Sequence, residues 1–227
     1  MQITEIYKSI QGESTFAGLP CVFVRLTGCN LRCSWCDSEY TFSGGHRMGV
    51  DEVIAEVERL SPGGGLVEIT GGEPLLQERE LLATIERLLA DAYTVLLETS
   101  GERPLAAVPQ QVVKVVDVKC PNSGAPDTFR MENLAALTAR DEVKFVLSDR
   151  SDYEFARDFV SRHRLATRVT AVLFSPAFRK DAGGTRDASH CLLDPRELAE
   201  WMVADDVPAR LGLQIHKFIW DPAMKGV

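Results

Sequence analysis

The segment from Gly28 to Ser38 reads GCNLRCSWCDS and contains three cysteines, Cys29, Cys33 and Cys36, with the spacing C-x3-C-x2-C. It directly follows an apolar run, residues 21–26, that has the composition of a β-strand. Three thiolates on one short loop can converge on a single metal centre, and no fourth cysteine lies nearby to complete a closed site. The spacing therefore favours a four-iron cluster held at three corners, whose fourth iron is open to a small molecule.

Two other readings of three close cysteines stay open at this point. The thiolates could be zinc ligands completed by His46, although zinc sites usually pair short C-x2-C units. They could also belong to a disulfide framework, which we disfavour because nothing in the chain indicates an oxidising compartment. Cys21, Cys120 and Cys191 fit no ligand spacing, and we expect them to be buried free thiols.

The bulk composition is that of an acidic globular protein. Its 227 residues and 25.1 kDa suit one well-cored domain, residues 1–227. A formal charge of −8 without a lysine–arginine block argues against a nucleic-acid partner. No apolar run approaches the ~20 residues that span a bilayer, and the first residues lack the features of a signal peptide. We therefore expect no membrane association and a cytoplasmic location, where thiols stay reduced.

Strand-like and helix-like segments alternate along the chain, and several strands are apolar throughout. This pattern predicts one α/β domain with a parallel sheet covered by helices, and roughly six βα units fall short of the eight of a full barrel. The predicted strands are residues 2–10, 22–26, 66–70, 93–97, 112–118, 143–147, 169–174 and 211–219. The predicted helices are residues 51–60, 75–90, 132–139, 151–164 with Ser151 as N-cap, and 195–203, and residues 177–190 are expected to form a loop.

Polar residues gather where the predicted strands end, which is the edge that lines the site in parallel α/β folds. Structural explanations exist for each one: Gly71 and Gly72 could merely turn the chain, Glu98 and Lys119 could form an ion pair, and His216 could be structural. Their coincidence at the edge that holds the cysteine loop outweighs these explanations. The residues are Cys29, Gly71, Gly72, Glu73, Glu98, Asp117, Lys119, Ser175, Gln214, His216 and Lys217.

The cysteine spacing, with Trp35 directly before the third cysteine, resembles the signature of the radical S-adenosylmethionine (radical SAM) superfamily. The segment from Gly71 to Pro74, Gly-Gly-Glu-Pro after a strand, is similar to the superfamily segment whose backbone holds the amino group of the methionyl moiety. This resemblance implies a shortened, partial parallel (βα)6-type radical SAM barrel. It also implies a [4Fe-4S] cluster and S-adenosylmethionine as cofactors.

Four further matches are narrower and resemble the 7-carboxy-7-deazaguanine synthase family of queuosine and 7-deazapurine biosynthesis. They are Ile10-Gln11-Gly12-Glu13, Arg25, Cys36-Asp37-Ser38 and Gln214-Ile215-His216-Lys217. The resemblance implies a lyase that contracts the ring of 6-carboxy-5,6,7,8-tetrahydropterin to 7-carboxy-7-deazaguanine with loss of ammonia. In this family the reduced cluster gives one electron to S-adenosylmethionine, and the resulting radical takes hydrogen from the pterin.

The resemblance also implies roles for individual residues. Cys29, Cys33 and Cys36 would bind the cluster, and Ser38 would bind Mg2+ through its hydroxyl. Residues around S-adenosylmethionine would be Trp35, Cys36, Asp37, Gly72, Asp117, Val118, Lys119 and Ser175. Residues around the pterin would be Ile10, Gln11, Gly12, Arg25 and Thr70, with Glu13, Arg25 and His216 as the catalytic group. A guanidinium such as that of Arg25 can grip the substrate carboxylate in a bidentate manner.

Partners implied by the resemblance are the pterin, a second copy of the chain in a homodimer, and an external one-electron donor of the flavodoxin or ferredoxin type. Three departures from the family pattern stand out: Ser38 in place of threonine, Asp117-Val118-Lys119 in place of Ser-Pro-Lys, and a chain that continues past Pro222 to Val227. Alternatives are another small radical SAM enzyme, such as a glycyl-radical activase, and a non-catalytic iron–sulfur or zinc protein.

Overall fold

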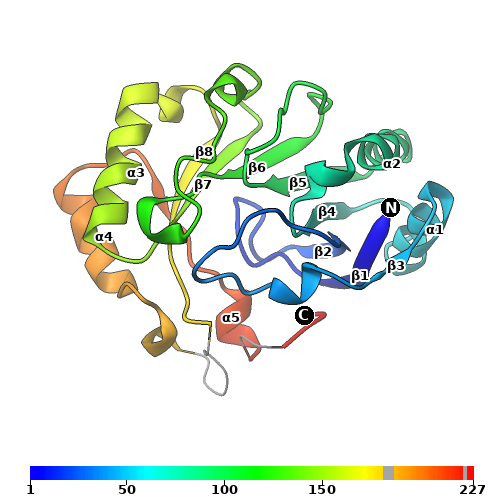
Figure 1. Cartoon of the computed structure of the whole chain (residues 1–227), viewed down its shortest axis with the longest axis horizontal. Coiled ribbons are helices and arrows are strands. Elements are labelled where there is room, and N and C mark those ends of the chain that lie inside the picture. The colour runs from blue at the N-terminus through cyan, green and yellow to red at the C-terminus, as the bar shows by residue number, and fades with distance from the viewer. Residues whose placement is uncertain (181–186, 222–223) are drawn as a thin grey trace.

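The apolar strands of the described residues form one nine-stranded sheet with the order β3-β1-β2-β4-β5-β6-β7-β8-β9, and amphipathic helices pack against it. The structure, a computed structural model, describes residues 1–180, 187–221 and 224–227 (Figure 1). The strands are β1 (Gln2–Ile10), β2 (Pro20–Leu26), β3 (His46–Arg47), β4 (Leu66–Gly71), β5 (Thr94–Thr99), β6 (Val113–Asp117), β7 (Glu142–Leu147), β8 (Ala171–Pro176) and β9 (Arg210–Leu211). The α-helices are α1 (Val50–Leu60), α2 (Glu78–Ala90), α3 (Arg150–His163), α4 (Pro195–Ala204) and α5 (His216–Ile219).

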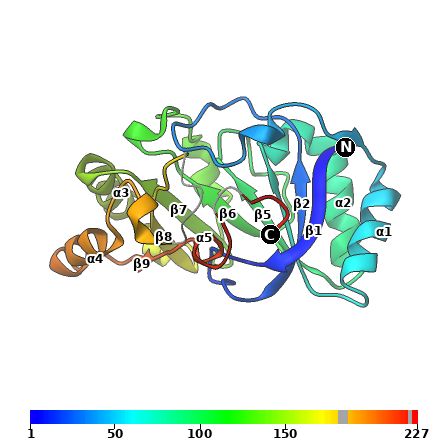
Figure 2. The ribbon, with the colours of Figure 1, turned by 90° about the horizontal axis from the view of Figure 1, so that it is seen from below.

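From β2 to β9 every neighbouring pair of strands is parallel, whereas β1 pairs antiparallel with both β2 and β3. The sheet curves, and α1, α2, α3 and α4 lie on its outside (Figures 1 and 2). Parallel neighbours need crossover connections, and these helices supply four of the six. Residues 100–112 and 118–141 connect β5 to β6 and β6 to β7 without an α-helix. The predicted shortened, partial parallel barrel is thereby confirmed as an open, parallel-dominated α/β sheet.

The two faces of the sheet carry different side chains because successive residues of a strand point to opposite faces. Outward-facing side chains such as Val24, Ile69 and Leu97 join the helices in the main hydrophobic core. On the inner face a smaller apolar cluster contains Cys21, Phe23, Leu66, Leu96 and Val113. Toward the carboxyl ends of the same strands the inner face becomes polar. The inner chamber is therefore apolar near the starts of the strands and polar near their ends.

One predicted strand is wrong. Residues 211–219 were expected to be extended, but β9 ends at Leu211 and α5 begins at His216. Ile215, Phe218 and Ile219 follow the three- and four-residue spacing of a helix, which fits the observed turn better than alternation does. The predicted helix at 132–139 is a short 3-10 helix, Met131–Ala135.

Asp149, rather than Ser151, caps α3, because its carboxylate accepts a hydrogen bond from the backbone N–H of Asp152 at 3.1 Å. The predicted loop at 177–190 lies partly outside the described residues, and within it Ala188–His190 form a 3-10 turn. Cys21, Cys120 and Cys191 are buried free thiols as expected. Among the helices of the described ranges, none has the length and apolar character needed to cross a membrane.

Candidate active site

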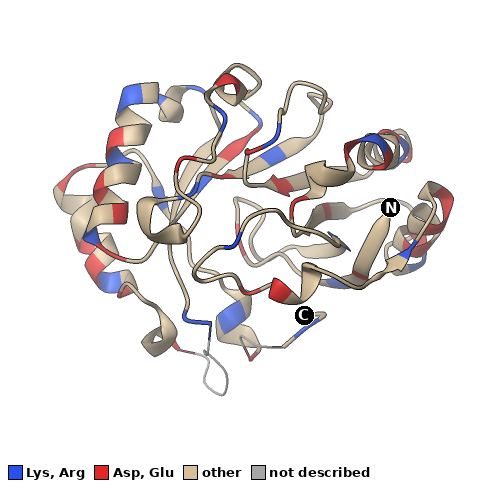
Figure 3. Cartoon of the chain, in the orientation of Figure 1, with Lys and Arg blue, Asp and Glu red and all other residues tan. Residues whose placement is uncertain are grey.

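A pocket of about 440 Å³ opens at the carboxyl ends of the parallel strands. Charged residues occur within the strands as well as on the outer helices (Figure 3). The pocket is lined by segments that are remote in sequence: residues 10–14, the cysteine loop, the ends of β2, β4, β5, β6 and β7, and the final residues of the chain. It is the site that the gathering of polar strand ends predicts.

All three motif cysteines line this pocket, are partly exposed and form no disulfide. Their loop is held by Gly28 N–H, which donates to Thr41 O at 2.7 Å, and by Ser34 N–H, which donates to Ser123 O at 2.7 Å. No three His, Cys, Asp or Glu side chains in the described part of the chain converge on one ion. A cluster binds each thiolate to a different iron, so this arrangement fits a cluster. His46 lies on edge strand β3 and does not line the pocket, which leaves the zinc reading without support.

The turn Gly71-Gly72 presses directly against the cysteine loop. A Cβ on Gly72 would lie 2.0 Å from the Gly28 carbonyl oxygen and 2.8 Å from Cys29 Cβ. Gly71 has φ of +133°, and its Cβ would lie 2.2 Å from the Leu26 carbonyl oxygen. Neither position therefore admits a side chain, as expected where two backbones approach closely. The following Glu73 fixes the turn, since its buried carboxylate accepts hydrogen bonds from Thr99 and Ser100 at 2.7–2.9 Å.

Asp117 and Lys119 lie on the side of the pocket beside Cys33. Lys119 Nζ donates to Asp117 Oδ2 at 2.7 Å, while Asp117 Oδ1 is buried and has no hydrogen-bond partner among the described residues. Burial favours the neutral amine, but the charge of Asp117 outweighs it and holds the pKa of Lys119 above its usual value. An unpaired buried acceptor is costly unless a ligand donates to it. The orphaned oxygen therefore suits a hydroxyl or ammonium group of S-adenosylmethionine.

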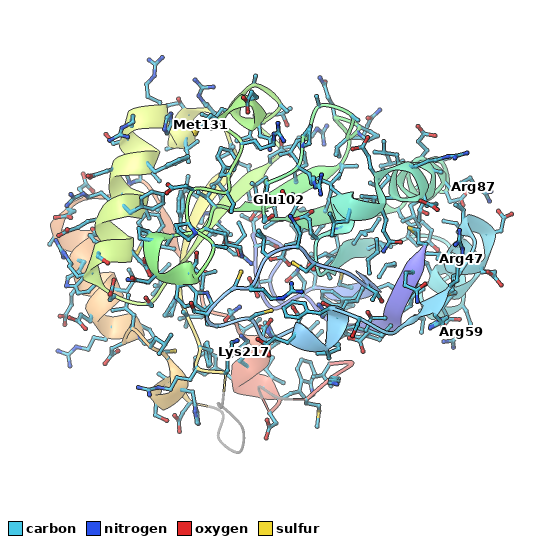
Figure 4. The ribbon with its side chains drawn as sticks, viewed as in Figure 1. Arg47, Arg59, Arg87, Glu102, Met131 and Lys217 are labelled. Carbon is cyan, nitrogen blue, oxygen red and sulfur yellow. The ribbon has the colours of Figure 1, made fainter. Side chains whose placement is uncertain are left out.

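Lys217 bridges the C-terminal segment to the cysteine loop. Its ammonium is buried, lies 2.7 Å from Asp37 Oδ2 and sits 4.9 Å from the centroid of the Phe178 ring. Burial alone would raise the pKa of Asp37, but Lys217 outweighs that effect and holds this pKa below its usual range. Figure 4 shows Lys217 on α5 close to the C-terminal segment, far from Arg47, Arg59 and Arg87 on the outer rim.

The inner chamber is organised around Lys144. Its buried ammonium lies 2.6 Å from Glu13 Oε2 and also bonds Glu98, while Gln214 Nε2 donates to Glu13 Oε1 at 2.7 Å. Burial would raise the pKa of Glu13, but the charge of Lys144 outweighs it and lowers that pKa to about 2. Glu13 is therefore ionised at neutral pH.

Glu68 lies deeper in the same chamber, and its pKa is shifted in the opposite direction from that of Glu13. Burial, followed by the neighbouring charges of Glu98 and Glu13, raises the pKa of Glu68 well above its usual value. Gln11 Nε2 donates a hydrogen bond to Glu68, and Gln11 Oε1 accepts one from the Glu13 N–H at 2.7 Å. The Gln11 amide is thus held at both ends.

Arg25 and His216 close two other walls. Arg25 Nε donates to Glu5 Oε1 at 2.9 Å and Arg25 Nη2 donates to Tyr7 Oη at 2.7 Å, which fixes its guanidinium beside the pocket. A Cβ on Gly12 would lie 2.0 Å from His216 Nδ1, so only glycine allows this contact. Burial lowers the pKa of His216, which favours the neutral imidazole at pH 7.

The pocket brings together all but two of the predicted site residues. Val118 and Ser175 do not line it: Val118 is buried in the main core, and Ser175 is buried beside Gly212. The alternative ion pair between Glu98 and Lys119 is wrong, because Glu98 bonds Lys144 and Lys119 bonds Asp117. The predicted residues that line the pocket are Ile10, Gln11, Gly12, Glu13, Arg25, Cys29, Cys33, Trp35, Cys36, Asp37, Ser38, Thr70, Gly72, Asp117, Lys119 and His216.

Sequence reasoning missed several residues that line the pocket, above all Glu68, Lys144, Tyr7 and Tyr40. A signal for two of them was present. Glu68 and Lys144 interrupt otherwise apolar strands, and a charge inside a buried strand needs a partner or a functional reason. Tyr7 and Tyr40 carried no such signal, because half-buried tyrosines are common.

The comparisons agree with this geometry. Residues 23–118 match the Radical SAM superfamily, and the chain is a radical SAM enzyme with a [4Fe-4S] cluster and S-adenosylmethionine as cofactors. It is 69% identical over 227 residues, 100% of both chains, to 7-carboxy-7-deazaguanine synthase of Koribacter versatilis. It is 39% identical over 230 residues to that of Chlorobaculum tepidum, covering 100% of this chain and 97% of the relative. The chain belongs to the 7-carboxy-7-deazaguanine synthase family.

Solved structures share the fold. QueE from Escherichia coli aligns with a TM-score of 0.68 at 22% identity, covering 93% of this chain and 92% of that one. A radical SAM methyltransferase from Sphaerobacter thermophilus aligns with a TM-score of 0.55 at 19% identity, covering 88% and 68%. At these identities the likeness concerns the fold alone. Family membership, which rests on the sequence relatives, removes the activase and electron-carrier alternatives.

Replacing Gly72 with alanine should disturb the cysteine loop, because the new Cβ would overlap the Gly28 carbonyl oxygen. Overpacking of this kind costs about 1–3 kcal/mol, so we expect affinity for S-adenosylmethionine to fall about tenfold or more. Iron content and equilibrium binding after anaerobic reconstitution measure the effect. Gly49→Ala is the matched control, since its Cβ would make only ordinary contact at 3.5 Å. Equal binding by both variants would contradict the close approach.

Replacing Lys144 with methionine should destabilise the fold in a pH-dependent way. Because the pKa of Glu13 is lowered to about 2, its ion pair stabilises the fold fully above its ordinary pKa of 4.5 and less as the pH falls toward 2. The variant should lose about 3 kcal/mol of unfolding free energy at neutral pH and less at about pH 3. Denaturant unfolding across this range is the measurement. Lys8→Met, at an exposed lysine that bonds only the Leu60 carbonyl oxygen, should show no such trend.

Proposed function

We propose that this enzyme converts 6-carboxy-5,6,7,8-tetrahydropterin to 7-carboxy-7-deazaguanine with loss of ammonia. The observation that carries the proposal is the shared pocket: Gln11, Glu13, Arg25 and His216 line the same cavity as the three cysteines. A substrate in this chamber would lie beside a cofactor bound at the cysteine loop. The names of the relatives, all 7-carboxy-7-deazaguanine synthases, support the same reaction.

The pterin is held by its polar edges in this proposal. Arg25 is already fixed by Glu5 and Tyr7, and its remaining N–H groups grip the carboxylate of the substrate. Gln11, locked between Glu68 and the Glu13 N–H, and Thr70, which donates to Glu98 at 3.3 Å, present further polar atoms. Because these side chains are ordered before substrate arrives, little conformational entropy is lost on binding.

Glu13 and Lys144 form a fixed ion pair, 2.6 Å apart, beside the proposed substrate position. Lys144 holds the pKa of Glu13 at about 2, so the carboxylate stays ionised and presents hydrogen-bond acceptors to the pterin. The neutral imidazole of His216 packs on Gly12 and can accept or donate beside them. When bound, the cluster and S-adenosylmethionine supply the radical that removes hydrogen from the pterin. The residues of the chain orient the substrate and exclude water from it.

Ser38 is proposed as a ligand of Mg2+. Its hydroxyl lies 3.7 Å from Cys36 Sγ, and the residue lines the pocket between Asp37 and Glu39. An oxygen donor at this place suits a hard cation whose other ligands are substrate oxygens and water.

Substitutions at Ser38 test the Mg2+ proposal. Ser38→Ala removes the oxygen donor and should abolish most of the stimulation of turnover by added Mg2+, whereas Ser38→Thr keeps the hydroxyl and should retain it. Initial rates measured across an Mg2+ titration, with chelated enzyme as the starting point, decide the matter. Stimulation of the alanine variant to the wild-type level would rule Ser38 out as a ligand.

We further propose that the chain acts as a single domain in a cytoplasmic homodimer and takes electrons from an external one-electron carrier. The partly exposed cysteine loop supports the last point, because a cluster bound there would lie close to the surface. The six cysteines, all free thiols in the structure, suit a reducing compartment.

An anaerobic assay tests the proposed reaction. The reconstituted enzyme is given S-adenosylmethionine, a reductant, Mg2+ and 6-carboxytetrahydropterin, and 7-carboxy-7-deazaguanine is followed by absorbance and mass. We expect product from the wild type and none from Cys33→Ala, which lacks one cluster ligand. Formation of 5′-deoxyadenosine without 7-carboxy-7-deazaguanine would refute the pterin as substrate and support cleavage of S-adenosylmethionine at the cluster.

A further inference from the structure

Strand β7 turns two charged side chains toward the interior of the curved sheet, Glu142 at its first residue and Lys144 two positions later. Both are fully or almost fully buried, and a buried charge is costly unless it is paired. Each has a partner in the connection between β1 and β2, residues 11–19, which stands 127 and 131 residues away in sequence at the two contacts, and Lys144 bonds Glu98 as well. One strand therefore holds this remote connection at two points.

Glu142 accepts three hydrogen bonds from Thr15. The backbone N–H of Thr15 donates to both carboxylate oxygens of Glu142, at 3.1 and 3.0 Å, and the Thr15 hydroxyl donates to Oε1. Two positions before Thr15, Glu13 is held by Lys144 at 2.6 Å. Neither Thr15 nor Glu142 lines the pocket, so this pair can act on a ligand only through the loop.

Hydrogen bonds within the connection set its shape but do not tie it to the sheet. Phe16 N–H donates to Ser14 Oγ and Leu19 N–H donates to Phe16 O, both at 3.1 Å. The neck of the connection is closed by Gln11 N–H donating to Leu19 O and by Gly18 N–H donating to Gln11 O, both at 2.8 Å. Beyond the neck, Thr15 and residues 17–19 are exposed, and Ser14 adopts a left-handed conformation with φ of +60°. The inner limb of the same loop carries Gln11, Gly12 and Glu13. Its position therefore depends on anchors outside the loop.

We propose that Glu142 is a positioning residue for the substrate, which acts through Thr15 to hold the loop of Gln11, Gly12 and Glu13 against the pterin. This inference rests on the proposed function, because it assumes that the loop contacts the pterin. In Figure 1 the dark blue connection that follows β1 runs inside the curved sheet toward β7. The anchor fixes the wall of the substrate chamber from outside it.

Substitutions that remove the anchor should weaken substrate use selectively. Thr15→Val deletes the hydroxyl donor at an exposed position where folding is not at risk, and we expect the KM for the pterin to rise about threefold. Glu142→Met, similar in volume, leaves both Thr15 donors unpaired and should raise it about tenfold. Thr15→Ser keeps the hydroxyl and should match the wild type. The KM for S-adenosylmethionine should stay unchanged in all three variants.

Hydrogen exchange of the backbone amides in residues 11–19 provides a readout independent of turnover. Faster exchange in Thr15→Val and Glu142→Met, with wild-type exchange in Thr15→Ser, together with the selective change in KM, supports the anchor. Unchanged exchange overturns it, and faster exchange with an unchanged pterin KM overturns the positioning role. A wild-type enzyme that fails to turn over the pterin instead refutes the proposed function, while the exchange data still test the contact itself.

Discussion

The buried ammonium of Lys144 joins segments of the chain that are remote in sequence. It holds Glu13 from the N-terminal connection and Glu98 from β5, and Glu13 is in turn bonded by Gln214 near the end of the chain. Removing one partner of such a buried ion pair leaves an uncompensated charge, which costs far more than the loss of a surface pair. The geometry of the substrate side of the pocket therefore depends on this contact.

The cofactor side is organised by close backbone approach instead of charge. Gly71 and Gly72 lie against the backbone of Leu26 and Gly28, and Glu73 locks the turn to Thr99 and Ser100. The cofactor side requires positions without a side chain, whereas the substrate side requires charged side chains in ion pairs. The two constraints meet at the cysteine loop, where Asp37 is bound by Lys217.

Much of this arrangement could be predicted from sequence, for reasons that differ between residues. The cysteine loop and the Gly-Gly turn are local in sequence, so their spacing alone identifies them. Strand segments that are apolar throughout and alternate with helical segments predict the parallel sheet, because the strands of such a sheet are buried on both faces. The role of Lys144 could not be predicted, since its partners lie 131 and 46 residues away and only the curvature of the sheet brings them together. Residues 211–219 were predicted as one strand because Leu211, Leu213 and Ile215 alternate with other residues, and the helical spacing begins only at Ile215. Val118 and Ser175 were assigned to the site from the family resemblance, but their side chains lie outside the pocket that residues near them line.

The contact between Gly12 and His216 has a consequence for folding during synthesis. The cysteine loop and strands β1 to β6 leave the ribosome early, yet the wall formed by Gly12 and Glu13 stays incomplete until Gln214 and His216 emerge, about 200 residues later. During synthesis the nascent chain thus exposes its three thiols well before it can enclose a substrate. Cluster delivery to the emerging loop can therefore precede closure of the chamber, which needs Gln214 and His216.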